Sequence, residues 1–461
     1  MTFRLFEGLL LAALTLALAG FSVLKRPSRA AGAAGSALLL GVVHLLTEGW
    51  RWQLVPAYGL VCGLSVFVVL RLAPVRHQDD HSHSHYGPRT FGLALAWLCV
   101  ASTVLLCVTF PIFALPEPSG PYAVGTTRMH LVDPARGETF TSDPGDRREL
   151  LLQVWYPAEP EAGDVLAAYW EDAPFYANHL RFVQTHSYAE APVARSGAGF
   201  PVLIFSHGYL LGYVSQNTVQ MEELASHGYV VASIAHPHEA LSVTFPDGRR
   251  VPFNESHLWR IVGLLSDQPE LRSLMDESHR IWTDDTCFVM DELARMDAGT
   301  GLFGGRLDTT RLGVFGMSFG GATASEVCLI DGRCRAGINM DGALWGDGLR
   351  EGGCVERPFM VVYDEVFEGM NDEMYRRVDA PAYRVTVSGS THGDFGDMTL
   401  MSPLLKRAGI LFGPIDDQRM VSIMNDYVRG FFDIHLRGAD AALLDGLSAE
   451  YPEVALESRN R

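Results

Sequence analysis

A serine between two glycines is the strongest chemical signal in this sequence. Residues 316–320 read Gly-Met-Ser-Phe-Gly, after an apolar run over 312–315 and before the small residues of 321–324. A sharp turn from a strand into a helix leaves no room for side chains beside the serine, which favours glycine at both flanking positions. Such a turn lifts the serine hydroxyl above the sheet, at the positive end of a helix. We therefore expect Ser318 to act as a nucleophile.

A serine hydroxyl is a weak nucleophile and needs an imidazole base. His392 and His435 are the histidines that follow Ser318 in the chain. His392 lies in the polar, glycine-containing segment 388–394, directly after a predicted strand, whereas His435 falls inside a predicted amphipathic helix. Because the base follows the acid and the serine along the chain in this kind of site, we predict His392 as the base and a structural role for His435.

A carboxylate must orient the imidazole and fix its tautomer. Asp341 and Asp364 each follow an apolar run that is typical of a strand, and either strand end would bring a carboxylate under His392. The residue pattern alone leaves both open as the acid. Asp394 and Asp397 lie too near His392 along the chain to be preferred.

The developing oxyanion needs two backbone N–H donors, one of which comes from the residue after the nucleophile. Phe319 supplies that donor. Residues 205–209 read Phe-Ser-His-Gly-Tyr after an apolar run, and their glycine allows the backbone to approach a substrate. We therefore predict the Tyr209 N–H as the second donor. His207 precedes the nucleophile, which favours a role in organising this loop.

These residues need a sheet that carries them at its edge. After the proline-containing linker at 116–121, short β-rich runs alternate with helical stretches, which predicts a mostly parallel sheet covered by helices. Strands are predicted over residues 150–155, 202–205, 229–234, 312–315, 336–340, 359–363 and 383–387. Helices are predicted over residues 216–226, 284–296, 319–329 and 418–436. The catalytic domain then covers 117–461, and the irregular stretch 239–282 is predicted to form a cap over a substrate pocket.

Residues 1–116 have a different composition and are predicted to form a transmembrane region. Apolar helices are predicted over residues 5–24, 31–46, 54–70 and 91–115, of which the second is the shortest and weakest. Their lengths suit a hydrocarbon core of roughly 30 Å. A cleaved signal peptide is the alternative for the first, but Glu7 beside Arg4 makes a poor basic leader. We expect these segments to lack the paired buried charges that mark many transport paths.

Basic residues in the short loops predict the orientation of the helices. The loops at 25–29 and 71–89 together carry six Lys and Arg residues, against Arg4 and Arg51 on the opposite side. Because basic loops are retained in the cytoplasm, the N-terminus and the C-terminal domain are both expected outside it. The protein is then an integral membrane protein with an extracytoplasmic catalytic domain.

Charge and cysteine spacing exclude several classes of protein. The chain has 36 Lys and Arg and 54 Asp and Glu residues, and the excess of acid lies after Pro116. A domain that acidic is an unsuitable nucleic-acid binder. The cysteines show no metal-binding spacing, so neither a metal nor a cofactor is expected; Cys328 and Cys334 form either a disulfide or two free thiols. The histidine-rich run at 77–85 is read as a solvated loop, with weak binding of a transition metal as the alternative.

Several segments together resemble the plasma-type platelet-activating factor acetylhydrolase family and its bacterial relatives. They are residues 205–208, 282–293, 316–323, 337–342 and the loop that holds His392. The resemblance extends over about residues 122–436. It implies an α/β-hydrolase fold, with Asp341 as the acid and an oxyanion hole from Tyr209 and Phe319. With bacterial relatives, the membrane that the helices enter is expected to be that of a bacterial cell. It also implies metal-free hydrolysis of short or oxidised acyl esters of phospholipids.

The sequence departs from that family in three places. Met317 stands where the family commonly has a histidine, Tyr209 replaces the usual leucine, and the helical region 1–116 has no counterpart in the secreted enzyme. The substrate therefore stays open between a lipid ester and other small esters. A general short-chain carboxylesterase or polyester hydrolase is the first alternative. A non-catalytic, ligand-binding membrane protein is the second.

The charge pattern of the loops gives a testable topology. We expect the C-terminus to lie outside the cytoplasm, because four helices return the chain to the side of its N-terminus. A reporter that requires an extracytoplasmic location should therefore be active when it is fused after Arg461, and a cytoplasmic reporter should not. Paired fusions to alkaline phosphatase and to a cytoplasmic fluorescent protein measure this. Activity of the cytoplasmic reporter alone would contradict the predicted orientation.

Overall fold

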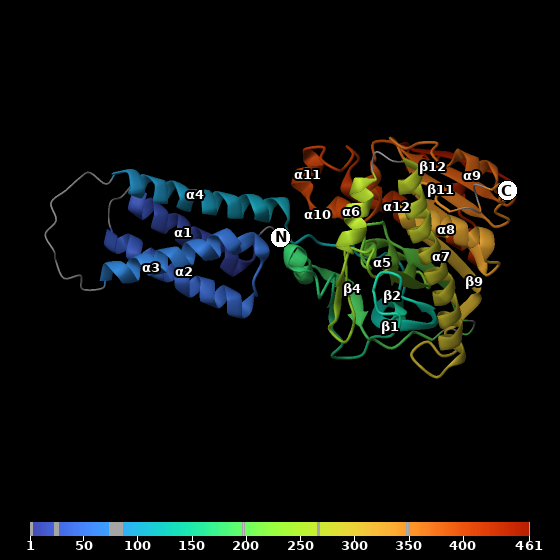
Figure 1. Ribbon diagram of the computed structural model, residues 1–461, viewed down its shortest axis with the longest axis horizontal. Coiled ribbons are helices and arrows are strands. Elements are labelled where there is room, and N and C mark those ends of the chain that lie inside the picture. Colours follow the sequence, from blue (N-terminus) through green and yellow to red (C-terminus); the bar gives the residue numbers. More distant parts are fainter. Residues whose placement is uncertain are drawn as a thin grey trace. The chain divides into compact units, whose positions relative to one another are not determined.

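The computed structural model describes residues 3–22, 27–72, 86–195, 197, 199–264, 268–346, 348 and 351–460. The histidine-rich run at 77–85 lies outside the described residues. The chain divides into two compact units, which are described separately (Figure 1). The first, here called the helical unit, contains Met1–Ala114, Ala173–Val183 and Met401–Leu404. The second, here called the hydrolase unit, contains Leu115–Asp172, Gln184–Leu400 and Leu405–Arg461.

Four long helices form most of the helical unit (Figure 1). They are α1 (Leu5–Ser22), α2 (Pro27–Thr47), α3 (Val55–Leu72) and α4 (Tyr86–Thr109). Each of the four segments predicted as helices overlaps one of these helices, and the fourth helix ends at Thr109 rather than at residue 115. Among the described residues, Trp52–Val69 and Phe91–Thr109 are long and apolar enough to cross a membrane, by length and composition, whereas the apolar parts of α1 and α2 are shorter. The prediction of four equivalent spans was thus too broad.

A buried ion pair lies at one end of these helices. Arg51 Nη1 donates to Glu7 Oε2 at 2.8 Å, and both side chains are fully buried. Arg4 also binds Glu7, and His44 Nδ1 lies 3.0 Å from Glu48 Oε2. The expectation that these segments lack paired buried charges was wrong, because the chain folds Arg51 back onto a residue 44 positions earlier. Removing one partner would leave a buried charge uncompensated.

An eleven-stranded sheet organises the hydrolase unit, in the order β13-β12-β11-β10-β9-β5-β6-β2-β1-β4-β3. The run from β12 to β6 is parallel, whereas β13, β2 and β3 pair antiparallel with their neighbours. The strands of the parallel run are β5 (Phe200–Ser206), β6 (Val230–Ala235), β9 (Leu307–Met317), β10 (Cys334–Met340), β11 (Phe359–Asp364) and β12 (Ala382–Val387). The flanking strands are β1 (Ala123–Gly137), β2 (Arg147–Ala158), β3 (Leu166–Ala168), β4 (Gln184–Ala189) and β13 (Val454–Arg459).

Helices cover both faces of the sheet, so its central strands are buried on both sides. On one face α7 (Gln268–Ala298) and α8 (Phe319–Ile330) share a core with the strands. On the other face α5 (Thr218–Ser226) and α12 (Asp417–Arg437) do the same. Every residue of β5 is buried, which explains why a continuous apolar run rather than an alternating one predicted it.

The predicted α/β class and mostly parallel sheet are confirmed. Each predicted strand lies within or overlaps an observed strand, and the predicted helices overlap α5, α7, α8 and α12. The stretch 239–282 contains the hairpin of β7 (Ser242–Thr244) and β8 (Arg250–Pro252), then α6 (Glu255–Gly263) and the first half of α7. Its role as a cap stays a prediction.

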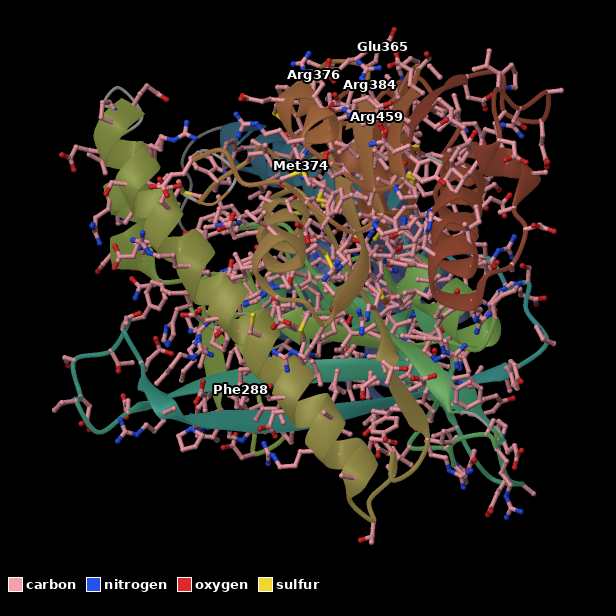
Figure 2. All side chains as sticks on the ribbon, turned by 90° about the vertical axis from the view of Figure 1, so that its right-hand side faces the viewer. Phe288, Glu365, Met374, Arg376, Arg384 and Arg459 are labelled. Atoms are coloured by element: carbon pink, nitrogen blue, oxygen red, sulfur yellow. A yellow bond between two sulfur atoms is a disulfide. The ribbon has the colours of Figure 1, made fainter. Side chains whose placement is uncertain are left out.

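Charged side chains protect the outer strand β13. Arg384 of β12 lies opposite Glu457 of β13 in the register and contacts it at 3.4 Å. Figure 2 shows Arg384, Arg376, Arg459 and Glu365 on the same side of the molecule. Charges along an outer strand oppose pairing with the strands of another molecule.

A disulfide between Cys328 and Cys334 joins the end of α8 to the start of β10. Among the described residues the other cysteines are free. The bond holds together the helix that begins at the candidate nucleophile and the strand that ends at a candidate acid.

We expect replacement of both bonded cysteines by alanine to lower the free energy of unfolding by about 2 kcal/mol, because the unfolded chain regains the entropy of an open loop. Denaturant unfolding of the variant measures this loss. Cys287→Ala, which removes a free cysteine, is the matched control and should leave the midpoint nearly unchanged. Equal unfolding of both variants would contradict a stabilising disulfide.

Candidate active site

The candidate catalytic residues gather at the carboxyl ends of adjacent parallel strands. Ser318 follows β9, Asp341 follows β10, Asp364 ends β11, and the loop after β12 carries His392. Ser206 ends β5 on the other side of β9. Because these strands are parallel neighbours, their ends lie along one edge of the sheet.

The turn at Ser318 has the backbone of a nucleophile elbow. Ser318 has φ 57° and ψ −122°, a backbone conformation that residues other than glycine rarely adopt. The helix α8 begins at the next residue. A Cβ on Gly320 would lie 1.9 Å from the carbonyl oxygen of Ser206, and one on Gly316 would lie 2.3 Å from Gly320. Glycine is therefore required at both positions, as the sequence pattern predicted.

The structure brings Ser318, His392 and Asp341 together. His392 Nε2 lies 3.0 Å from Ser318 Oγ, and His392 Nδ1 lies 2.5 Å from Asp341 Oδ2. Asp341 is buried, and its other oxygen accepts the backbone N–H of Asp364 at 3.1 Å. This arrangement allows proton transfer from the hydroxyl to an imidazole whose orientation the carboxylate fixes.

Asp364, the other acid that the sequence left open, makes a different contact. Its Oδ1 accepts the backbone N–H of Phe367 at 2.5 Å, and no hydrogen bond joins its side chain to His392. Burial, reinforced by the nearby charge of Asp341, raises the pKa of Asp364. The side chain of Asp364 therefore organises the turn after β11, and only its backbone touches the Ser-His-Asp group.

The other candidate acids and bases lie apart from Ser318. Asp394 Oδ2 accepts the backbone N–H groups of Thr391 and Gly413, so Asp394 shapes the loop that presents His392. Asp397 is buried and accepts the hydroxyl of Tyr169. His435, on α12, lies 3.2 Å from the hydroxyl of Tyr383 on β12, and burial lowers the pKa of His435 to about 4. The structure thus keeps His435 away from the site.

The loop after β5 passes beside the nucleophile. The Gly208 N–H donates to Gln216 Oε1 at 3.0 Å, and the Leu210 N–H donates to the Glu239 carbonyl at 3.3 Å. The Tyr209 amide lies between these two anchored groups. A Cβ on Gly208 would lie 3.5 Å from Ser318 Cβ, so the loop lies in close contact with the nucleophile.

The two backbone N–H groups predicted to bind the oxyanion are left without a hydrogen-bond acceptor by the described residues of the protein. Within the described part of the chain, we find no hydrogen bond from the N–H of Tyr209 or of Phe319. The Tyr209 and Phe319 rings pack with centroids 4.9 Å apart. Both amides are thus available to an oxygen that develops charge beside Ser318.

A second Ser-His-Asp array, which the sequence analysis missed, lies beneath this loop. His236 Nδ1 lies 2.8 Å from Asp285 Oδ2, and His236 Nε2 lies 3.3 Å from Ser206 Oγ. Ser206, His236 and Asp285 are buried, and Asp285 also binds Arg148 at 2.7 Å. Burial lowers the pKa of His236 to about 4. These three side chains are buried away from solvent, and they hold the end of β5 in place.

His207 is also a structural histidine. It is buried, its Nδ1 lies 2.7 Å from the Gly208 carbonyl oxygen, and burial lowers its pKa to about 3. A neutral ring bonded to its own loop fits the predicted organising role. The sequence signal for His236 was its position directly after β6, at the same edge of the sheet as Ser206 and Ser318.

Among the described residues, the group with a metal-like arrangement lies in the helical unit. Glu7, His44 and Glu48 place their ligand atoms within 4.8 Å of one another. The guanidinium groups of Arg4 and Arg51 already bind Glu7, so cations of the chain itself occupy the carboxylate. None of these three residues belongs to the group of residues described at Ser318.

Comparison with known proteins identifies the family. The family model described as platelet-activating factor acetylhydrolase, isoform II, matches residues 108–255 and 295–441. A protein of Arthroderma benhamiae named probable 1-alkyl-2-acetylglycerophosphocholine esterase is 25% identical over 391 residues, which cover 74% of this chain and 93% of that protein. The platelet-activating factor acetylhydrolase of Cavia porcellus is 25% identical over 379 residues, which cover 76% of this chain and 84% of that protein.

A solved structure shows the same fold. The ferulic acid esterase from Streptomyces cinnamoneus superposes with a TM-score of 0.64 at 28% identity, and the match covers 75% of this chain and 99% of that chain. The family predicted from the sequence motifs is confirmed. The chain belongs to the platelet-activating factor acetylhydrolase, isoform II, family and is a carboxylic ester hydrolase.

Proposed function

We propose that this protein is a membrane-anchored serine hydrolase that cleaves short-acyl or oxidised phospholipid-type esters. One observation carries the proposal: Ser318 Oγ, both ring nitrogens of His392 and the Asp341 carboxylate form a continuous hydrogen-bonded chain beside two unpaired backbone N–H groups. This arrangement supplies a nucleophile, a base and oxyanion donors at one point.

Ser318 Oγ attacks the ester carbonyl while His392 Nε2 takes its proton. Asp341 stabilises the imidazolium that results, since its carboxylate contacts Nδ1. The N–H groups of Tyr209 and Phe319 donate to the oxyanion of the tetrahedral intermediate. His392 then gives its proton to the leaving alcohol, and the acyl group stays on Ser318. Water, activated by His392, releases the acid in the second half of the reaction.

Apolar side chains next to the nucleophile support an ester with an apolar acyl group. Phe319 shares a buried cluster with Met275 and Trp282. The partly buried residues that pack against this cluster are Tyr209, Ile261, Leu271, Ile281 and Trp345. The names of the two relatives above, probable 1-alkyl-2-acetylglycerophosphocholine esterase and platelet-activating factor acetylhydrolase, support a phospholipid-type ester as the substrate.

A general short-chain carboxylesterase is the second candidate. The similar solved structure is a ferulic acid esterase, which is named after an aromatic acid. The aromatic residues that pack around Phe319 would suit such an acyl group as well. A ligand-binding protein without activity is disfavoured, because binding alone does not require a hydrogen-bonded Ser318 and His392.

Membrane anchoring and an extracytoplasmic catalytic domain belong to the same proposal. The apolar helices Trp52–Val69 and Phe91–Thr109 support an anchor. The disulfide between Cys328 and Cys334 supports an oxidising compartment. An anchor of this kind would keep the active site close to lipid esters, whereas the acidic charge disfavours a nucleic-acid partner.

The full chain in detergent should hydrolyse a 2-acetyl phospholipid and the acetyl, butyryl and octanoyl p-nitrophenyl esters, with the highest kcat/KM on the phospholipid. Ser318→Ala should reduce all of these rates to background, because Ser318 is the nucleophile that His392 contacts in the described part of the chain. Preference for the aryl esters would favour the carboxylesterase candidate. Hydrolysis that persists in Ser318→Ala would contradict the serine mechanism.

A pair of variants separates the two aspartates. Asp341→Asn should lower kcat by about 10³- to 10⁴-fold, because the amide favours the wrong tautomer of His392. Asp364→Asn is the matched control: it keeps the backbone N–H that binds Asp341 and should cost less than about tenfold. Steady-state kinetics of both variants test this assignment. A larger loss in Asp364→Asn would reverse it.

A further inference from the structure

We propose that Glu239 is a positioning residue that holds the Tyr209 amide in the oxyanion hole. The inference rests on the proposed function, since it concerns a donor to the oxyanion formed at Ser318. Tyr209 is also one of the positions where the sequence departs from its family, and its hydroxyl gives Glu239 a contact that the usual leucine could not make.

Both the side chain and the main chain of Glu239 bind the oxyanion loop. Glu239 Oε1 accepts the Tyr209 hydroxyl at 3.0 Å. The Glu239 carbonyl accepts the N–H of Leu210, the next residue of the loop, at 3.3 Å. Both contacts lie on the C-terminal side of the peptide plane that must present the Tyr209 N–H. The bond from the Gly208 N–H to Gln216 Oε1 lies on the N-terminal side, so the plane is held between these contacts.

The carboxylate of Glu239 is itself held in place. It is fully buried, and its Oε2 accepts the Trp282 Nε1–H at 2.7 Å. Trp282 stacks on His236 with centroids 3.9 Å apart and meets the Phe319 ring edge-on at 5.0 Å. Glu239 is therefore part of a rigid layer that also contains the residue of the second oxyanion donor.

The Tyr209 hydroxyl has additional buried partners. It lies 2.6 Å from His257 Nε2 and 3.3 Å from Ser278 Oγ. His257 comes from α6 and Ser278 from α7, both within the segment predicted as a cap. The side chain of Tyr209 is thus fixed at its far end, although its backbone lies in a loop.

The loop needs this restraint because its backbone is strained. Leu210 has φ 66°, in the left-handed region that favours glycine. Without the bonds to Glu239, the Tyr209–Leu210 peptide could rotate to relieve that strain. The backbone of Tyr209 would then lose one of the restraints that fix the direction of its N–H. Glu239 contacts the loop and the buried layer but not Ser318 or His392, so its role is positioning and not catalysis.

Tyr209→Phe and Glu239→Gln, in the full-length protein, test the inference. Phenylalanine keeps the ring that packs on Phe319 and removes only the hydroxyl. Glutamine keeps the shape and an oxygen for Trp282 and removes the charge. Each variant should lower kcat about tenfold with KM within about twofold, since the displaced N–H serves only the transition state. The double variant should lose less than the sum of the two single losses, because both variants remove the bond between Tyr209 and Glu239.

A trifluoromethyl ketone gives a second measurement, because its adduct with a serine places a negative oxygen in the oxyanion hole. Its Ki should rise by the factor by which kcat/KM falls, with active sites counted by titration with diethyl p-nitrophenyl phosphate. A merely structural defect would lower the active-site count and leave Ki unchanged. Tyr229→Phe is the matched control, since the buried Tyr229 hydroxyl donates to Asp433 at 2.7 Å, and Tyr229 precedes β6 at the opposite end of the strands.

The outcomes separate the two proposals. Serine-dependent hydrolysis with kcat and Ki of both variants within twofold of the parent would overturn the positioning role alone. Additive losses in the double variant would overturn it as well. Hydrolysis that survives Ser318→Ala would contradict the proposed function, and the oxyanion role of Tyr209 would fall with it.

Discussion

The close approach of two backbones is the constraint on which the rest of this structure depends. The carbonyl of Ser206 at the end of β5 faces Gly320 at the start of α8, with space for hydrogen atoms only. That contact fixes the turn at Ser318 in its strained conformation and sets the oxyanion loop beside the nucleophile. A methyl group at Gly320 would separate β5 from α8, and with them the nucleophile from its oxyanion donor.

Buried polar groups connect this contact between β5 and α8 to the surrounding loops. Below the loop, His236 links Ser206 to Asp285 on α7. Beside it, the side-chain oxygen of Gln216 accepts the N–H of Gly208. The main-chain carbonyl of Gln216 accepts the N–H of Asp397, which is close to His392 in the chain. The oxyanion loop and the histidine loop are therefore tied to one segment. Because such networks are costly when half satisfied, they specify one arrangement of the site.

The sequence predicted the elements and the residues whose local pattern is decisive. Glycines about Ser318 and the apolar runs of the parallel strands have local signatures, so the sheet and the elbow were foreseen. Asp341 and Asp364 have the same local pattern, and only their contacts across strands distinguish them. The pairs of Arg51 with Glu7 and of Glu239 with Tyr209 join residues distant in the chain. No periodicity or spacing encodes such contacts.

Trapping the acyl-enzyme tests the central claim, that Ser318 is the nucleophile, most directly. The full-length protein is mixed with p-nitrophenyl butyrate, quenched in acid within the first turnover and mapped by peptide mass spectrometry. We expect a butyryl group on the peptide that contains Ser318, with fragment ions that place it on the serine. A butyryl group on another side chain, or turnover without any acylated peptide, would contradict it.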